Sequence, residues 1–304
     1  MKTRMSLIAT ALTLLTSTCS LAAPHSASGI ILTYDLDGNE KLSLEEFVDA
    51  RRQRFAATDT NHNGTIEEDE YVYEWEGHMK TRMADDRKAS VKQTHIRFNA
   101  IDKDDDKQIT KAEMDAVGGR GFDFMDQNKD GLILASDADP VREGRSADSD
   151  EKPKLEQRPM LRMPTTHNIK GFMDLYDTNG DGKVDKAEFQ AVRDEQFART
   201  DENGDKVLTE QEYVLEFEDR LDAQYEKTYE GQVKQTYVRF GVLDKDESGH
   251  MTFSEYMQSG FRSFSRYDTT GDGFITIDDP APVFERESND NDDKATQTAS
   301  VSNP

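Results

Sequence analysis

Residues Asp177 to Glu188 place oxygen-bearing side chains at the spacing that a hard divalent cation requires. The stretch reads DTNGDGKVDKAE, with an acid or an amide at positions 1, 3 and 5 and a carboxylate at position 12. Calcium takes about six to eight oxygen ligands, and the backbone carbonyl of position 7 and a bidentate carboxylate at position 12 complete such a shell. Gly182 at position 6 allows the sharp turn that gathers these groups. The stretch therefore predicts a calcium-binding loop.

The same spacing recurs seven more times, in loops that begin at Asp35, Asp59, Asp102, Asp126, Asp201, Asp244 and Asp268. We number the eight loops 1 to 8 in chain order, which makes Asp177 the start of loop 5. The predicted ligands stand at positions 1, 3, 5, 7 and 12, with position 7 contributing its backbone carbonyl. In loops 1 to 4 they are Asp35, Asp37, Asn39, Lys41, Glu46; Asp59, Asn61, Asn63, Thr65, Glu70; Asp102, Asp104, Asp106, Gln108, Glu113; Asp126, Asn128, Asp130, Leu132 and Asp137. In loops 5 to 8 they are Asp177, Asn179, Asp181, Lys183, Glu188; Asp201, Asn203, Asp205, Val207, Glu212; Asp244, Asp246, Ser248, His250, Glu255; Asp268, Thr270, Asp272, Phe274 and Asp279.

Loop 5 fits the template D-x-[DN]-x-[DN]-G-x5-E at every fixed position. On these residues the chain resembles the EF-hand superfamily over about residues 28–284. The resemblance implies an all-α fold of helix–loop–helix units, with short β-bridges between paired loops and calcium as the ligand. Val184 at position 8 is the apolar residue through which two such loops usually bridge.

The loops differ in how completely they match this pattern. Loops 2, 5 and 7 are complete, whereas loops 1, 3 and 6 carry Glu40, Lys107 and Lys206 at position 6, where a left-handed backbone is expected. Loops 4 and 8 end in the shorter side chains of Asp137 and Asp279. An aspartate reaches the ion less easily in bidentate fashion, so these two loops are expected to bind calcium more weakly or to accept magnesium. The alternative is that some loops are turns that bind nothing.

Adding 142 to the starts of loops 1 to 4 gives the starts of loops 5 to 8, which indicates a tandem duplication. The run VKQTHIRFNAIDKD at 91–104 matches VKQTYVRFGVLDKD at 233–246 at nine of fourteen positions. The chain is therefore predicted to form two tandem four-loop domains, at 24–141 and 166–284, that fold separately. Residues 142–165 are predicted to be a linker, with PMLRMP at 159–164 as an alternative docking segment, and residues 285–304 a disordered polar tail.

The spacing between loops predicts which of them pair. Residues 47–58 lack Gly and Pro and suit one helix of about 18 Å, so loops 1 and 2 should not be neighbours. The segment 71–101 is long enough for two helices and a turn, with Ser90 and Gln93 as a capping box that opens the second helix. This predicts that loop 2 pairs with loop 3 and loop 6 with loop 7, which leaves loops 1 and 4 and loops 5 and 8 to each other.

The first 22 residues have the basic start, the apolar run and the small-residue cleavage site of a secretory signal peptide. Loss of Lys2 and Arg4 with this segment changes the formal charge from −24 to −26, and eight calcium ions would bring −26 + 16 to −10. Nucleic acid and anionic lipid would be repelled by such a chain. We expect a periplasmic or secreted protein without membrane insertion after signal cleavage.

An enzyme is not indicated, because the six histidines show no zinc spacing and the chain has no phosphate loop or nucleophile elbow. The sequence favours an exported calcium buffer or a calcium-stabilised structural protein. The alternative is a calcium-dependent sensor or adaptor that binds a protein partner.

Overall fold

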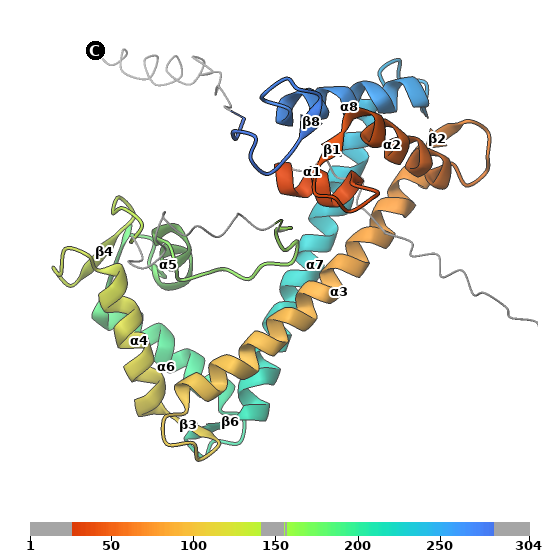
Figure 1. Ribbon diagram of the computed structural model, residues 1–304. Coiled ribbons are helices and arrows are strands. Elements are labelled where there is room, and N and C mark those ends of the chain that lie inside the picture. Colours follow the sequence, from red (N-terminus) through yellow and green to blue (C-terminus); the bar gives the residue numbers. More distant parts are fainter. Residues whose placement is uncertain (1–25, 141–154, 156, 283–304) are drawn as a thin grey trace, which may run out of the picture.

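The computed structural model describes residues 26–140, 155 and 157–282 and is mostly helical, with short strands inside the loops (Figure 1). The first half contains α1 (Ala27–Tyr34), β1 (Leu42–Ser43), α2 (Leu44–Thr58), β2 (Thr65–Glu67), α3 (Glu68–Ile101), β3 (Gln108–Thr110), α4 (Lys111–Met125) and β4 (Leu132–Leu134). The second half contains α5 (Ile169–Tyr176), β5 (Lys183–Asp185), α6 (Lys186–Thr200), β6 (Val207–Thr209), α7 (Glu210–Leu243), β7 (His250–Thr252), α8 (Phe253–Tyr267) and β8 (Phe274–Ile275). Each helix of the second half begins and ends 142 residues after its counterpart, as the repeat predicts.

The loop residues themselves set the helix boundaries. Every described helix ends at the aspartate of position 1, and the helices that leave loops begin after a cap at position 9. In loop 3 the Thr110 hydroxyl accepts from Glu113 N at 3.3 Å, while Glu113 Oε2 accepts from Thr110 N at 2.9 Å. This reciprocal capping box satisfies two of the free amides at the start of α4. The position-12 glutamate thus serves both the loop and the helix that follows.

Helices α3 and α7 are each continuous for 34 residues, and the predicted turn within 71–101 is wrong. Ser90 lies inside α3, where its carbonyl accepts from the Thr94 hydroxyl at 3.0 Å, so it does not open a second helix. The segment contains one glycine, Gly77, and no proline that would stop the helix. A helix of this length spans about 51 Å, which separates loop 2 from loop 3 by the full rod.

The loops pair between the two halves of the chain, and the predicted pairings 2–3, 6–7, 1–4 and 5–8 are wrong. The antiparallel strand pairs are β1–β8, β2–β7, β3–β6 and β4–β5, which join loop 1 to 8, 2 to 7, 3 to 6 and 4 to 5. Position 8 faces position 8 in each pair, as in Ile66 opposite Met251 and Ile109 opposite Leu208, and all four of these side chains are fully buried. The expectation that loops 1 and 2 are not neighbours is confirmed.

These pairings place α3 and α7 side by side and antiparallel as a central rod, visible as the long orange and cyan helices of Figure 1. Helices α2 and α8 lie at the rod end that carries loops 2 and 7, which we call the 2/7 end. Helices α4 and α6 leave the opposite end, which carries loops 3 and 6 and which we call the 3/6 end. Figure 1 shows the α4–α6 pair diverging from the rod to form a V.

An arginine packed on a glycine marks the helix crossing at each end. At the 2/7 end the Arg51 guanidinium donates to the carbonyl of Tyr256, and a Cβ on Gly260 would come within 2.4 Å of Arg51 Nε. At the 3/6 end Arg193 lies the same way over Gly118, where a Cβ would come within 2.2 Å of its Nε. Each arginine and its glycine come from different halves, so these contacts also join the halves.

The segment predicted as linker is partly packed against the rod. Leu161 is 2% exposed and lies in a core cluster with Met79, Met83, Phe217 and Leu221. The Asp86 carboxylate accepts from the amides of Met160 at 2.6 Å and Leu161 at 3.0 Å. This part of the segment is therefore packed against the rod of its own chain, and the alternative that 159–164 docks on another protein stays a prediction.

Several predictions concern residues outside the described ones: the signal peptide at 1–22, most of the linker at 142–165 and the tail at 285–304. Separate folding of 24–141 and 166–284 stays a prediction, although each half alone would leave every described strand without its present partner. None of the described helices has the length and apolar character needed to cross a membrane.

Candidate metal centres

The aspartate at position 1 organises every loop through the same hydrogen bond. One carboxylate oxygen of this aspartate accepts from the backbone amide of position 6 at 2.8–3.1 Å in all eight loops. In loop 5, Asp177 accepts from Gly182 N at 3.0 Å and from Asp181 N at 3.1 Å. The chain therefore folds back on its first carboxylate, which brings positions 1, 3 and 5 to one side of the loop.

This turn requires a left-handed backbone at position 6, as the sequence predicts. The values of φ are +63° at Glu40, +68° at Lys107 and +71° at Lys206, and the other five loops have glycine there. Position 4 is also left-handed in all eight loops, a requirement that the sequence analysis missed. The residues at position 4 are Gly38, His62, Asp105, Lys129, Gly180, Gly204, Glu247 and Gly271. The recurrence of glycine at this position in four loops was the available signal, and it shows that Gly38 of loop 1 is not misplaced.

The glutamate at position 12 folds over the start of its own loop. Its Oε1 accepts from a backbone amide of position 2 or 3 at 2.7–3.4 Å in the six loops that end in glutamate. Backbone hydrogen bonds from Lys103 and Thr110 hold the pKa of Glu113 below its ordinary value, and those from Thr252 and Lys245 do the same for Glu255. These carboxylates are therefore ionised at neutral pH, the form that ligates a metal.

Loops 4 and 8, which end in aspartate, differ from the other six. Asp137 accepts from Leu134 N at 2.8 Å, and among the described residues it makes no hydrogen bond to positions 2 or 3 of loop 4. Asp279 reaches Thr270 N at 3.4 Å. Within the described residues no helix follows either loop, and prolines at 140, 280 and 282 explain why. The shorter side chain thus loses contact with the loop start in loop 4. In loop 8 it keeps a contact as long as that of Glu212 in loop 6, and it also accepts from the Thr270 hydroxyl at 3.2 Å.

Three loops bring carboxylates together closely enough to hold one ion. Three carboxylate oxygens, one from each residue, lie within 4.8 Å of one another in Asp35/Asp37/Glu46, in Asp102/Asp104/Asp106 and in Asp244/Asp246/Glu255. These are loops 1, 3 and 7. The other loops fill part of the ligand set with amide or hydroxyl side chains, which supply neutral oxygens instead of charges. These loops also offer suitable ligands, since calcium binds neutral oxygens as well as carboxylate oxygens.

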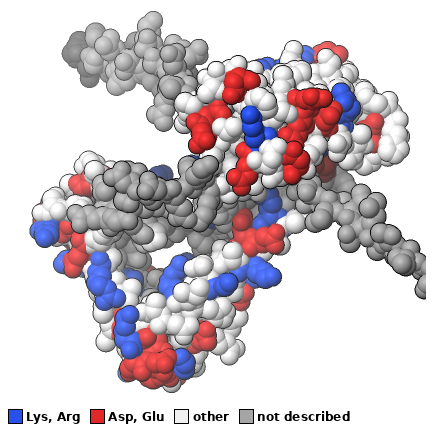
Figure 2. Space-filling view, in the orientation of Figure 1, with Lys and Arg blue, Asp and Glu red and all other residues white. Residues whose placement is uncertain are grey.

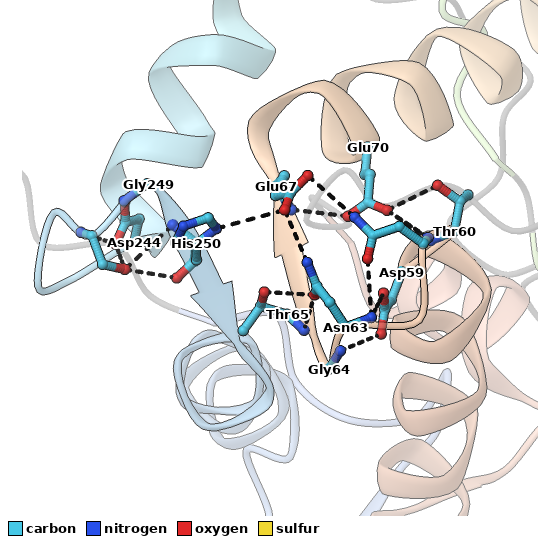
Figure 3. A network of polar contacts seen from close by, with 12 residues as sticks. Asp59, Thr60, Asn63, Gly64, Thr65, Glu67, Glu70, Asp244, Gly249 and His250 are labelled. Atoms are coloured by element: carbon cyan, nitrogen blue, oxygen red, sulfur yellow. Dashed lines mark hydrogen bonds and ion pairs between the residues drawn. The ribbon is translucent and has the colours of Figure 1, made fainter.

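Paired loops contact each other through residues beside the ligands. In Figure 3 Glu67 stands between the two loops of the 2/7 end: Asn63 of loop 2 donates to its Oε1 at 2.9 Å, and His250 Nδ1 of loop 7 lies 3.9 Å from the same atom. In loops 1 and 8 the two position-7 residues meet, with Lys41 Nζ lying 3.6 Å from the centre of the Phe274 ring. Residues of each of these loops therefore contact the partner loop from the other half of the chain.

The EF hand family model matches residues 169–192. This stretch holds α5, all of loop 5 and the start of α6, and the match supports an EF-hand unit there and suggests that it binds calcium. No curated protein and no solved structure matches the chain.

Proposed function

We propose that this chain is an exported, non-enzymatic calcium-binding protein in which all eight loops are EF-hand sites. The observation that carries the proposal is the hydrogen bond from position 1 to position 6, repeated in every loop with the same geometry. The family match covers one of these loops, and the shared geometry extends the assignment to the others. Loops 4 and 8 are the weakest sites and the ones proposed to accept magnesium.

The pairing supports a role as a calcium-stabilised structural protein as well as a buffer. Each strand pair joins one loop of the first half to one of the second. Because the chain carries a formal charge of −24, its halves repel each other at low salt. Calcium in a loop pair would neutralise charge at the contact between the halves, so we propose that calcium binding stabilises the assembled form.

A calcium titration of the mature chain by calorimetry tests this function. We expect at least loops 2, 5 and 7 to be occupied at millimolar free calcium, because exported calcium modules have dissociation constants of about 10⁻⁴–10⁻³ M. Fewer than two bound ions at about 5 mM calcium would contradict the proposal. Glu188→Gln should remove one ion, whereas Glu226→Gln, an exposed change in the middle of α7, should leave the count unchanged.

A second function, that of an adaptor for a protein partner, is favoured by one observation. A cavity lies between the rod and the α4–α6 pair, next to loops 3 and 6. If calcium controls access to this cavity, the hydrogen-exchange rates of the backbone amides in α4 and α6 should change when calcium is added.

A further inference from the structure

The inside of the V at the 3/6 end encloses a cavity of about 770 Å³. Its walls come from α3, α4, α5, α6 and α7, and the segment 164–167 also lines it. Much of the lining is apolar, including Val117 of α4, Val192 of α6 and Phe217 of α7. Ligand pockets in proteins have volumes of about 300–1,000 Å³ and mostly apolar walls with a few polar groups, so both the size and the lining fit a binding site.

Arginines line this apolar space from four of these five helices. They are Arg97 of α3, Arg120 of α4, Arg193 and Arg199 of α6, and Arg220 of α7. The lining contains two carboxylates, those of Glu195 and Glu216, against these five cations. The cavity is thus a positively charged region in a chain whose formal charge is −24, and Figure 2 shows blue side chains along the inner side of the V.

The arginines differ in how far the protein itself satisfies them. Glu216 accepts from Arg199 at 3.1 Å and from Arg220 at 2.8 Å, and Arg193 donates to the carbonyl of Met114. Arg120 is exposed on α4, and no ion pair joins it to any other described residue. Positive charge therefore remains available at the cavity after the internal contacts are counted.

We propose that this cavity binds an acidic segment of a partner protein, with apolar side chains of that segment seated between the arms of the V. The five arginines exceed the two carboxylates of the lining by three charges, and a single-headed amphiphile such as a fatty acid would neutralise one of these three. Arginines on four different helices instead fit several carboxylates spread along one peptide, and an arginine fork binds carboxylates well. The net negative charge of the chain repels an acidic segment, so such a segment can bind only where positive charge is concentrated, as it is in this cavity.

Two larger rings stand at the equivalent positions of the 2/7 end. Trp75 stands where the second half has Phe217 (75 + 142), and Tyr256 stands where the first half has Met114 (114 + 142). Both are at most 2% exposed and lie in one core cluster. Arg239 and Arg51 lie over these two rings, at 5.1 Å and 3.8 Å from the ring centres. The 3/6 end has Arg97 and Arg193 at the positions of these two arginines (239 − 142 and 51 + 142) but lacks the two larger rings.

The proposal is tested with the mature full-length chain in saturating calcium and about 0.15 M salt, where long-range charge effects are screened. The probe is a fluorescein-labelled helical peptide in which Glu surrounds Leu and Phe, and its control has every Glu changed to Lys. Fluorescence anisotropy measures binding. We expect the acidic peptide to bind, Arg120→Glu to weaken it about fivefold, the scale of one exposed ion pair, and Phe217→Trp to weaken it by filling the cavity as Trp75 does.

The matched control is Arg262→Glu, because Arg262 is the exposed counterpart of Arg120 at the 2/7 end (120 + 142). It should leave the affinity for the acidic peptide unchanged. The proposal is overturned if the acidic peptide does not bind, if Arg262→Glu weakens binding as much as Arg120→Glu, or if sodium dodecanoate displaces the peptide, which would assign the cavity to a small amphiphile. Calcium binding is measured separately by calorimetry, so failure of either proposal is distinguishable from failure of the other.

Discussion

The two ends of the α3–α7 rod are equivalent in sequence position but are held together differently. At the 2/7 end α2 and α8 are joined to each other by aromatic packing, in which Phe55 lies 5.3 Å from Phe253 and 5.6 Å from Tyr256 between ring centres. At the 3/6 end the position of Phe253 is taken by Lys111 (253 − 142), which bridges Asp115 of its own helix and Asp194 of α6, both at 2.5 Å. Apolar contacts at one end are thus replaced by exposed ion pairs at the other.

The same contrast appears inside the loops. Loops 2 and 7 have glycine at position 6, with φ of +89° at Gly64 and +80° at Gly249. Loops 3 and 6 have lysine there, with φ of +68° at Lys107 and +71° at Lys206. A left-handed backbone costs a non-glycine residue about 1–2 kcal/mol. The comparison shows that one duplicated backbone supports an end with aromatic packing and an end that borders a cavity, through a few side-chain differences.

The largest expected effect comes from truncating the rod residue that differs between the ends. Trp75→Ala should lower the free energy of unfolding by about 3–5 kcal/mol, because it removes a buried ring from a full cluster. Phe217→Ala at the equivalent position should cost about 2 kcal/mol less, since the ring is smaller and already borders a cavity. Urea unfolding in calcium measures both. Equal losses would show that the two ends are packed alike.

A smaller effect is expected from relieving the strained loops. Lys107→Gly should stabilise loop 3 by about 1 kcal/mol, which corresponds to roughly fivefold tighter calcium binding if the gain appears only in the bound loop. The reverse change at the other end, Gly64→Lys, should weaken loop 2 by a similar amount. Calorimetric calcium titrations of both variants give the comparison. An unchanged affinity for Lys107→Gly would mean that the left-handed lysine is not strained.

The sequence predicted the loops well because their chemistry is local. The position-1 aspartate, the left-handed position 6 and the buried position 8 all lie within twelve residues, and each requirement is met by the loop's own hydrogen bonds. The left-handed backbone at position 4 was not predicted, because five loops have glycine at position 6 and this glycine is part of the known template. At position 4, four loops have other residues, such as His62 and Asp105, which tolerate the left-handed region.

The pairing of loops was not predictable in the same way, because a duplicated chain offers each strand two chemically similar partners. Ile66 of loop 2 can bury itself equally well against Ile109 or Met251, and their side chains do not distinguish them. The choice depends on whether the chain turns between residues 71 and 101. Segment length favoured a turn, whereas the helix continues because no residue there interrupts its hydrogen bonds. A single wrong inference about helix continuity therefore changed all four pairings.

The smallest expected effect tests the ion pairs that replace aromatic packing at the 3/6 end. The hydrogen bond from Lys111 holds the pKa of Asp194 below its ordinary value of 3.8. A carboxylate with a lowered folded-state pKa contributes stability that is present above pH 3.8 and is lost as the pH falls through the folded value. Asp194→Asn should therefore lower the melting temperature slightly at neutral pH and low salt.

The loss should vanish both in about 1 M salt, where the screening length is about 3 Å, and in acid, where the wild-type carboxyl is protonated as well. Asp49→Asn is the matched control, because it removes an exposed pair with Arg52 within a single helix of the 2/7 end. This pair lies within α2 and links no two helices, so its removal should not change how α2 is held to α8. A salt-independent loss for Asp194→Asn would mean that Asp194 does not act through its charge, because the asparagine Oδ1 can still accept the hydrogen bond from Gln190. In that case the ion pairs would not contribute to the difference between the two ends. The cavity at the 3/6 end would then follow from its smaller side chains alone.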